Sequence, residues 1–82
     1  MKYIIVEDMG LEQAVIFSEC LFHKTVASGF SKVVSAGFCS INPEIFESAD
    51  VKVNVWGKSI GLNLRFRPED EEIIKQSINF RV

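Results

Sequence analysis

The chain has 82 residues, a formal net charge of -2 and a hydrophobic content of 48%, and seven of its residues are phenylalanine. A chain of this length forms a single compact domain, residues 1–82, with one modest core, and its slight negative charge excludes binding to nucleic acid through overall basicity alone. No apolar run reaches the roughly 18 residues of a membrane span, and the N-terminal run is too short for a signal peptide, so we expect a cytoplasmic protein with free cysteines and no membrane partner.

The first two predicted elements are strands. Residues 2–7 and 13–18 are rich in β-branched and aromatic side chains. Asp8-Met9-Gly10, between them, has the composition of a turn. This pattern predicts a β-hairpin at the start of the chain.

A short helix and a third strand are predicted next. Residues 20–28 lose the period of two, and Gly29 suits the end of a helix. Residues 31–41 return to the composition of a strand, and Gly37 inside that strand indicates a bulge or a close approach of another backbone. Asn42-Pro43 ends it, and residues 43–49 form either one helical turn or a loop.

The stretch from Val51 to Phe66 predicts a second hairpin. Gly57-Lys58 lies between two alternating runs, and glycine at the first loop position suits a tight type II′ turn. With those two residues as the loop, one face is aliphatic and needs a partner layer, and the other face is mostly polar. The aliphatic face would hold Val51, Val53, Val55, Ile60, Leu62 and Leu64. The other face would hold Lys52, Asn54, Trp56, Ser59, Gly61, Asn63 and Arg65.

The last predicted element is a C-terminal helix that begins near Pro68. The acidic run 69–72 lies in its first turn, where the helix dipole favours carboxylates, and Ile73, Ile74 and Ile78 form an apolar stripe. We expect this helix to cover the aliphatic face of the second hairpin. The whole pattern predicts an α+β fold, with a mostly antiparallel sheet of about five strands and helices on one face.

Three fragments of chemical motifs are incomplete. Gly57-Lys58-Ser59 lacks the preceding glycine of a phosphate-binding loop and is followed by a strand. Cys20 and His23 have the spacing of half a zinc site, but Cys39 is the only other soft ligand. As a nucleophile and its base, the same pair lacks an identifiable third group. We therefore expect no catalytic residues, no metal site and no cofactor.

The mostly polar face of the second hairpin is the candidate interaction surface. Tryptophan and arginine are favoured anchors at protein interfaces. Stacking combined with phosphate contacts is also how a sheet holds single-stranded nucleic acid. An ordinary solvated face is the third interpretation. The candidate residues are Lys52, Asn54, Trp56, Asn63 and Arg65.

Two segments carry a resemblance to other proteins. KVVSAGF, at 32–38, and GKSIGLNLRFRPED, at 57–70, resemble segments of small bacterial and prophage-type proteins to which no chemistry is attached. The match covers about a quarter of the chain. It implies a stand-alone protein from the surroundings of a mobile element, and it supplies no functional residue.

These observations predict a small non-enzymatic protein-interaction module. The high hydrophobic content of so small a chain favours self-association, which we expect to give a homodimer. An adaptor or inhibitor role towards a host or phage protein fits the resemblance. The alternative is a protein that binds single-stranded nucleic acid on the outer face of the 51–66 hairpin.

Overall fold

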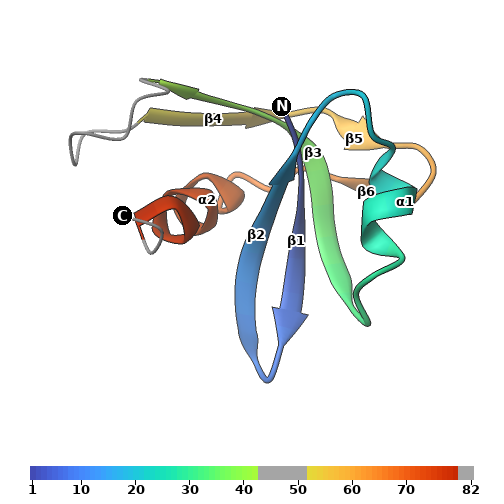
Figure 1. Ribbon diagram of the computed structural model, residues 1–82. Coiled ribbons are helices and arrows are strands. Elements are labelled where there is room, and N and C mark those ends of the chain that lie inside the picture. Colours follow the sequence, from blue (N-terminus) through green and yellow to red (C-terminus); the bar gives the residue numbers. More distant parts are fainter. Residues whose placement is uncertain (43–51, 80–82) are drawn as a thin grey trace.

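A four-stranded antiparallel sheet forms the centre of the computed structural model, which describes residues 1–42 and 52–79 (Figure 1). The predicted α+β class is confirmed. The strand order in this sheet is β2-β1-β3-β4, and β5 and β6 form a separate two-stranded sheet. The elements are β1 (Lys2–Asp8), β2 (Leu11–Phe17), α1 (His23–Ala27), β3 (Val33–Asn42), β4 (Lys52–Trp56), β5 (Lys58–Ser59), β6 (Leu64–Arg65) and α2 (Asp70–Asn79).

β1 is the strand with both faces buried. It pairs with β2 on one side and with β3 on the other, and Tyr3, Ile4 and Ile5 are fully buried. Because side chains alternate along a strand, Tyr3 and Ile5 face one side of the sheet and Ile4 faces the other. The run of consecutive apolar residues at the start of the chain therefore supplies two cores.

α2 covers one face of the sheet. Its Ile74 and Ile78 are buried against β1, β2, β3 and β4, which confirms the apolar stripe. This first core consists of Tyr3, Ile5, Ala14, Cys39, Ile41, Val53, Ile74 and Ile78.

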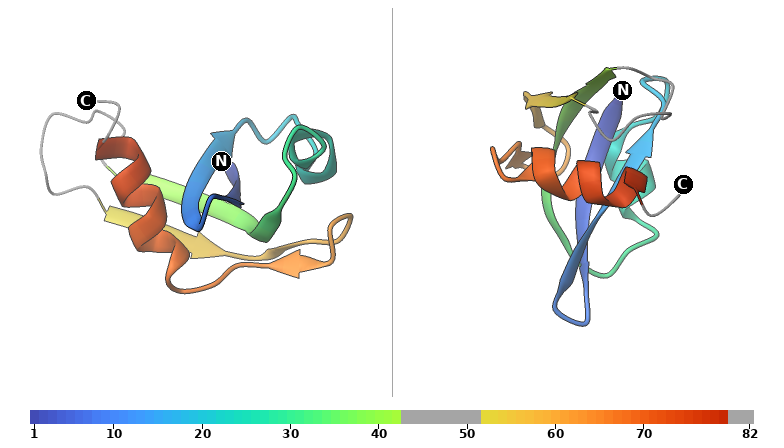
Figure 2. Two further views of the ribbon diagram at one scale, coloured as in Figure 1. Left: turned by 90° about the horizontal axis from the view of Figure 1, so that it is seen from below. Right: turned by 90° about the vertical axis from the view of Figure 1, so that its left-hand side faces the viewer.

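α1 packs against the opposite face. Ala27 joins Ile4, Val6 and Ala36 in a second cluster, with Leu62 and others packed around it. Figure 2 shows the two helices on either side of β1 and β2. The short helix is confirmed, but the expectation that both helices lie on one face is wrong, because β1 has an apolar side chain for each face.

The predicted hairpin over 51–66 is wrong. β4 pairs with β3, in a register that places Trp56 opposite Phe38. The actual hairpin is smaller and joins β5 to β6, with Lys58 opposite Arg65. Alternation in 51–56 specifies the faces of a strand but not its neighbour, and β3 is long enough to provide a partner edge. Gly57, with φ of 82°, turns the chain out of the sheet between β4 and β5.

The predicted aliphatic face is divided between different surroundings. Val53 and Val55 pack towards α2, as expected, whereas Leu62 and Leu64 pack against the second cluster. Ile60 is 85% exposed. The turn at Gly57 separates the valines of β4 from the residues that follow, so the two groups do not lie on paired strands. Val51 and the segment 43–49 lie outside the described residues.

A buried hydrogen-bond network holds the start of α2 against β1. The Tyr3 hydroxyl donates to Asp70 Oδ2 at 2.6 Å, and both residues are fully buried. Arg67 donates to the same carboxylate from its backbone N–H at 3.0 Å and from Nε at 2.9 Å. Its guanidinium also pairs with Glu12 at 2.9 Å. Asp70 therefore does more than complement the helix dipole, because its carboxylate also connects the start of α2 to β1.

The environment of Tyr3 predicts a loss of stability at high pH. Burial raises the pKa of its hydroxyl well above the ordinary value, and the hydrogen bond to Asp70 raises it further. The unfolded chain therefore loses this proton first, near pH ~10, and the free energy of unfolding falls above that pH by up to about 1.4 kcal/mol per pH unit.

Urea unfolding measured on both sides of pH ~10 checks this expectation. Tyr3→Phe provides the control, since Tyr3 is the only tyrosine. The variant should lose about 1.5–3 kcal/mol at neutral pH, the typical contribution of a hydrogen bond to a charged acceptor, but should lack the tyrosine-dependent fall. An identical alkaline fall in both proteins would contradict the assignment to Tyr3.

Candidate functional site

A row of four side chains crosses the sheet on the face opposite α2. The strand register places Phe17 opposite Lys2, Lys2 opposite Phe38, and Phe38 opposite Trp56. Residues that lie directly opposite one another on neighbouring strands share a face and touch. We call Phe17, Lys2, Phe38 and Trp56 the aromatic row.

The aromatic row contains a ring stack and a cation. The rings of Phe38 and Trp56 lie 18° from parallel, with centroids 6.4 Å apart. Lys2 Nζ lies 6.0 Å from the centre of the Phe38 ring and 5.6 Å from that of Phe22, which precedes α1. It also donates to the carbonyl of Leu21 at 2.9 Å. The ammonium group is thus held between two rings.

His23 anchors α1 beside this row. Its ring meets Phe17 and Phe38 edge to face, with centroids 5.4 Å and 5.7 Å away. The Nε2 atom lies 2.8 Å from the carbonyl oxygen of Gly37, and because a carbonyl only accepts, Nε2 carries the proton. His23 is buried, and this bond fixes its tautomer and orientation.

The two cysteines occupy different surroundings. Cys20 is exposed in the segment before α1, while the His23 ring three residues later is buried. Cys39 is buried in the first core, where burial raises the pKa of its thiol. The Cys39 thiol therefore lies away from the electropositive, partly exposed setting that activates a nucleophile.

A hollow of about 470 Å³ opens beside the aromatic row. Its described lining includes the cations Lys2, Lys24 and Lys58 and no carboxylate. Phe38 lies in its wall, Phe22 is 73% exposed, and Ile60 is also among the lining residues. We call this site the lysine hollow.

The lysine hollow is assembled from distant parts of the chain. Lys2 comes from β1, Lys24 from α1 and Lys58 from β5. Carboxylates of the α2 first turn, Glu71 and Glu72, line a different hollow, between α2 and β4. A chain with a net charge of -2 thus carries a local concentration of positive charge at the lysine hollow.

The five candidate residues from the sequence do not form one surface on a hairpin. Lys52, Asn54 and Trp56 are exposed on one face of β4, and Trp56 belongs to the aromatic row. Asn63 and Arg65 belong to the β5–β6 hairpin and line a hollow of about 250 Å³ that shares Lys58, Ser59 and Ile60 with the lysine hollow. The Arg65 guanidinium lies 5.4 Å from the centre of the Phe66 ring.

Sequence reasoning missed the contributions of Lys2, Phe22 and Lys24. Lys2 had a detectable signal, because alternation along residues 2–7 places it on the same face as Ile4. Phe22 and Lys24 had no such signal in the sequence, since their positions depend on how α1 packs against the sheet.

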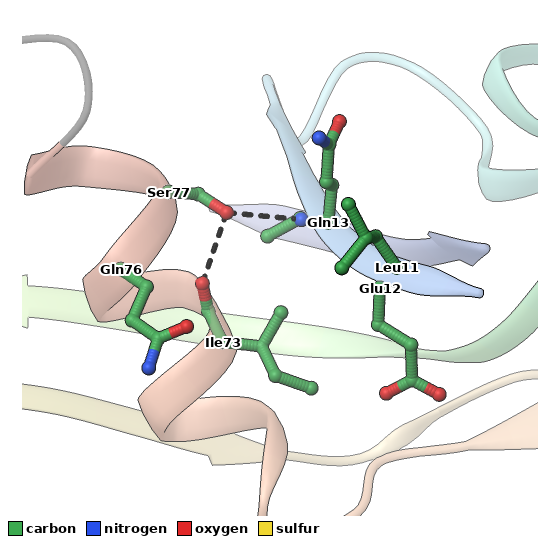
Figure 3. Close-up of a pocket in the computed structure, with 7 residues that line it drawn as sticks. Leu11, Glu12, Gln13, Ile73, Gln76 and Ser77 are labelled. Carbon is green, nitrogen blue, oxygen red and sulfur yellow. Dashed lines mark hydrogen bonds between the residues drawn. The ribbon is translucent and has the colours of Figure 1, made fainter. Parts of the chain in front are cut away.

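A second hollow, of about 440 Å³, lies between β2 and α2 (Figure 3). Its Ser77 hydroxyl donates to the carbonyl of Ile73 at 2.9 Å and accepts from the backbone N–H of Ala14 at 3.1 Å. Glu12, also in its lining, is paired with Arg67. These polar groups hold α2 against the edge of β2, so we attribute a structural role to them.

Comparisons with known proteins return no relative. No family model, curated protein or solved structure matches this chain. Among residues 1–42 and 52–79, no group of three or more His, Cys, Asp or Glu side chains is arranged to hold a metal ion. Neither α1 nor α2 has the length and hydrophobicity to cross a membrane.

Gly57 supports the aromatic row, and its replacement tests that contact. A Cβ atom at Gly57 would lie 2.7 Å from Phe38 Cδ2, and the residue has φ of 82°. We expect Gly57→Ala to destabilise the protein by about 1–3 kcal/mol, from backbone strain and displacement of the Phe38 ring.

Urea unfolding, with Trp56 fluorescence as the probe, measures the effect of Gly57→Ala. Gly29→Ala is the matched control, because its Cβ would have only an ordinary contact, 3.7 Å from the carbonyl oxygen of Val26. Equal losses in the two variants would contradict a specific role for Gly57.

Proposed function

We propose that this protein is a non-enzymatic binding module that holds single-stranded nucleic acid on the aromatic row and the lysine hollow. The observation that carries the proposal is the gathering of Lys2, Lys24 and Lys58 with accessible rings around a hollow whose described lining holds no carboxylate. The binding surface thus differs from the one expected from the sequence, although it retains Trp56.

The chemistry of the surface matches that of a single strand. Unpaired bases stack on aromatic rings regardless of sequence, and the phosphates between them attract cations. Trp56 is 47% exposed and Phe22 is 73% exposed, so both rings retain surface for a base. Lys2 lies close to Phe22 and to Phe38, the ring that supports Trp56, and can meet a phosphate that follows a stacked base.

The other polar groups of the hollow support binding in preference to catalysis. His23 uses Nε2 for its bond to the Gly37 carbonyl, and the Ser59 hydroxyl accepts from the backbone N–H of Leu62 at 3.3 Å. Apart from the Thr25 hydroxyl, the lining groups left to meet a ligand are ammonium ions and rings. Ammonium ions attract a ligand and rings stack on it, but neither supplies a general base near neutral pH.

The salt dependence of binding tests the role of the lysines. Each phosphate neutralised on a single strand contributes about -0.7 to the slope of log K against log salt, so three lysines predict a slope of about -2. Fluorescence anisotropy of a labelled oligothymidylate, beginning at low salt, measures this slope. Lys58→Ala should make it shallower by about 0.7.

Lys32→Ala is the matched control for Lys58→Ala. Lys32 is an exposed lysine that pairs with Glu7 at 3.1 Å and lies outside the lining of the lysine hollow. We expect it to leave the slope unchanged. The proposal fails if the oligonucleotide does not bind at low salt, or if both substitutions change the slope equally.

The exposed ring of Phe22 provides a test of stacking. We expect Phe22→Ala to weaken oligothymidylate binding by about 1–3 kcal/mol, the usual contribution of one stacked base. Trp56, the only tryptophan, reports the binding through quenching of its fluorescence. Leu11→Ala removes another exposed apolar side chain, at the β2–α2 hollow, and should have no effect on binding. Equal binding by Phe22→Ala and the unsubstituted protein would contradict stacking at Phe22.

A protein partner at the same surface is the second candidate function. Phe22, Trp56 and Ile60 are exposed apolar side chains, and tryptophan is a favoured interface anchor. A partner segment with acidic and aromatic residues would complement the lysines and the exposed rings. Binding of such a segment would suit an adaptor or an inhibitor. A glutamate–tyrosine copolymer that quenches Trp56 under conditions where oligothymidylate does not would favour this function over the first.

A further inference from the structure

The outer edge of β4 carries backbone groups that point away from the sheet. The backbone N–H of Cys39 donates to the carbonyl of Met1 at 2.8 Å, and the terminal amino group of Met1 lies 3.1 Å from the Cys39 carbonyl oxygen. Both backbone groups of Cys39 therefore point towards β1. The opposite residue on β4, Val55, must then belong to a non-hydrogen-bonded pair, with its N–H and C=O directed outwards. Val53, two residues away, has the same direction.

The two outer edges of the four-stranded sheet differ. On β2, the hydroxyl of Ser77 already accepts the outward N–H of Ala14. On β4, the described part of the chain supplies no backbone partner for the outward groups of Val53 and Val55. An unpaired edge of this kind is a template for another strand.

We infer that a second copy of this chain pairs with β4, antiparallel and centred on Asn54, to form a dimer with one continuous sheet. In this register, Val53 of each copy lies opposite Val55 of the other. These are the residues whose backbone groups point outwards, so each pair exchanges both of its hydrogen bonds. The strand sequence KVNVW is therefore complementary to itself.

The side chains on the open face agree with the same register. Lys52 of each copy lies opposite Trp56 of the other, in a non-hydrogen-bonded pair, where side chains approach most closely. A lysine ammonium over an indole ring is a favourable cation–π contact. Lys52 of the second copy thus continues the sequence of rings and cations formed by Phe17, Lys2, Phe38 and Trp56.

A register shifted towards Gly57 is disfavoured. Centring the pairing on Val55 would leave Lys52 beyond the end of β4 of the second copy, because that strand ends at Trp56 and the chain turns out of the sheet at Gly57. It would also place Gly57, with φ of 82°, in the ladder opposite Val53. The turn at Gly57 therefore limits how far the pairing can shift towards the end of β4.

Charges on α2 also suit a two-fold axis at this edge. Glu71, Glu72 and Lys75 line a hollow of about 280 Å³ together with Lys52 and Asn54. Both signs of charge thus flank the axis on each copy. Away from the axis, a two-fold dimer brings a residue of one copy to a different residue of the other, so opposite charges can pair there.

Substitutions at Asn54 test the inference, because this exposed residue faces its own copy only in the dimer. Sedimentation equilibrium of the unsubstituted chain should give about twice the monomer mass of 9.3 kDa. Asn54→Asp and Asn54→Lys each place like charges face to face at the axis, so each variant alone should approach the monomer mass. An equimolar mixture should recover the dimer mass, because opposite charges then meet.

Asn63→Asp is the matched control. It makes the same chemical change at an exposed position outside β4 and should leave the dimer mass unchanged. Far-UV circular dichroism would verify that the Asn54 variants remain folded. The inference is overturned if the unsubstituted chain has the monomer mass at every concentration. It is equally overturned if the Asn54 variants keep the dimer mass, or if their mixture stays monomeric.

The dimer and nucleic-acid binding are separable. Phe22→Ala and Lys58→Ala lie outside β4 and should leave the dimer mass unchanged. Failure to bind oligothymidylate would overturn the proposed function but not the dimer. A protein that binds oligothymidylate but has the monomer mass would overturn the dimer and leave the proposed function standing.

Discussion

The hydrogen bond from the Tyr3 hydroxyl to the Asp70 carboxylate connects the parts on which the rest of the structure depends. Both groups are fully buried, so the carboxylate must be satisfied by donors within the protein. Arg67 supplies two of these donors and extends the network to Glu12 on β2. The contact therefore sets where α2 begins and holds the connection from β6 against the sheet. Breaking it would leave a buried charge with fewer partners, which is costlier than losing a surface ion pair.

Fixing that connection has consequences on the other face of the sheet. Phe66 donates its backbone N–H to the carbonyl of Gly57, which closes the β5–β6 hairpin at the end away from its loop, and the hairpin lies beside β3. Lys58 then lies beside the hollow to which Lys2 and Lys24 also contribute. A cationic surface thus arises on a chain of net negative charge, because folding brings these three lysines to one hollow. The buried network thus fixes the end of the segment that also supplies Lys58 to the surface proposed for binding.

Sequence patterns were reliable where a side chain's role follows from local alternation. The first hairpin, the third strand, the short helix and the C-terminal helix with Ile74 and Ile78 were all predicted, because their periods and turn residues agree. The second hairpin was wrong, because a valine that alternates with polar residues is equally suited to any neighbouring strand. Of the five candidate residues, Lys52, Asn54 and Trp56 share one face of β4, whereas Asn63 and Arg65 do not. Lys24 and Phe22 could not be identified, since nothing local indicates which face of the sheet α1 will cover.

The sequence by itself determined the α+β class, the faces of the strands in the first half and the apolar stripe of α2, because these depend on contacts between residues close in the chain or on a fixed period. Only the tertiary structure decided that β4 pairs with β3, that the helices lie on opposite faces, and that Asp70 is buried against Tyr3. It also decided that Lys2, Lys24 and Lys58 line one hollow. The physical reason is that each of these outcomes is a choice among distant partners with similar local patterns, and burial of two cores at once selects one of them.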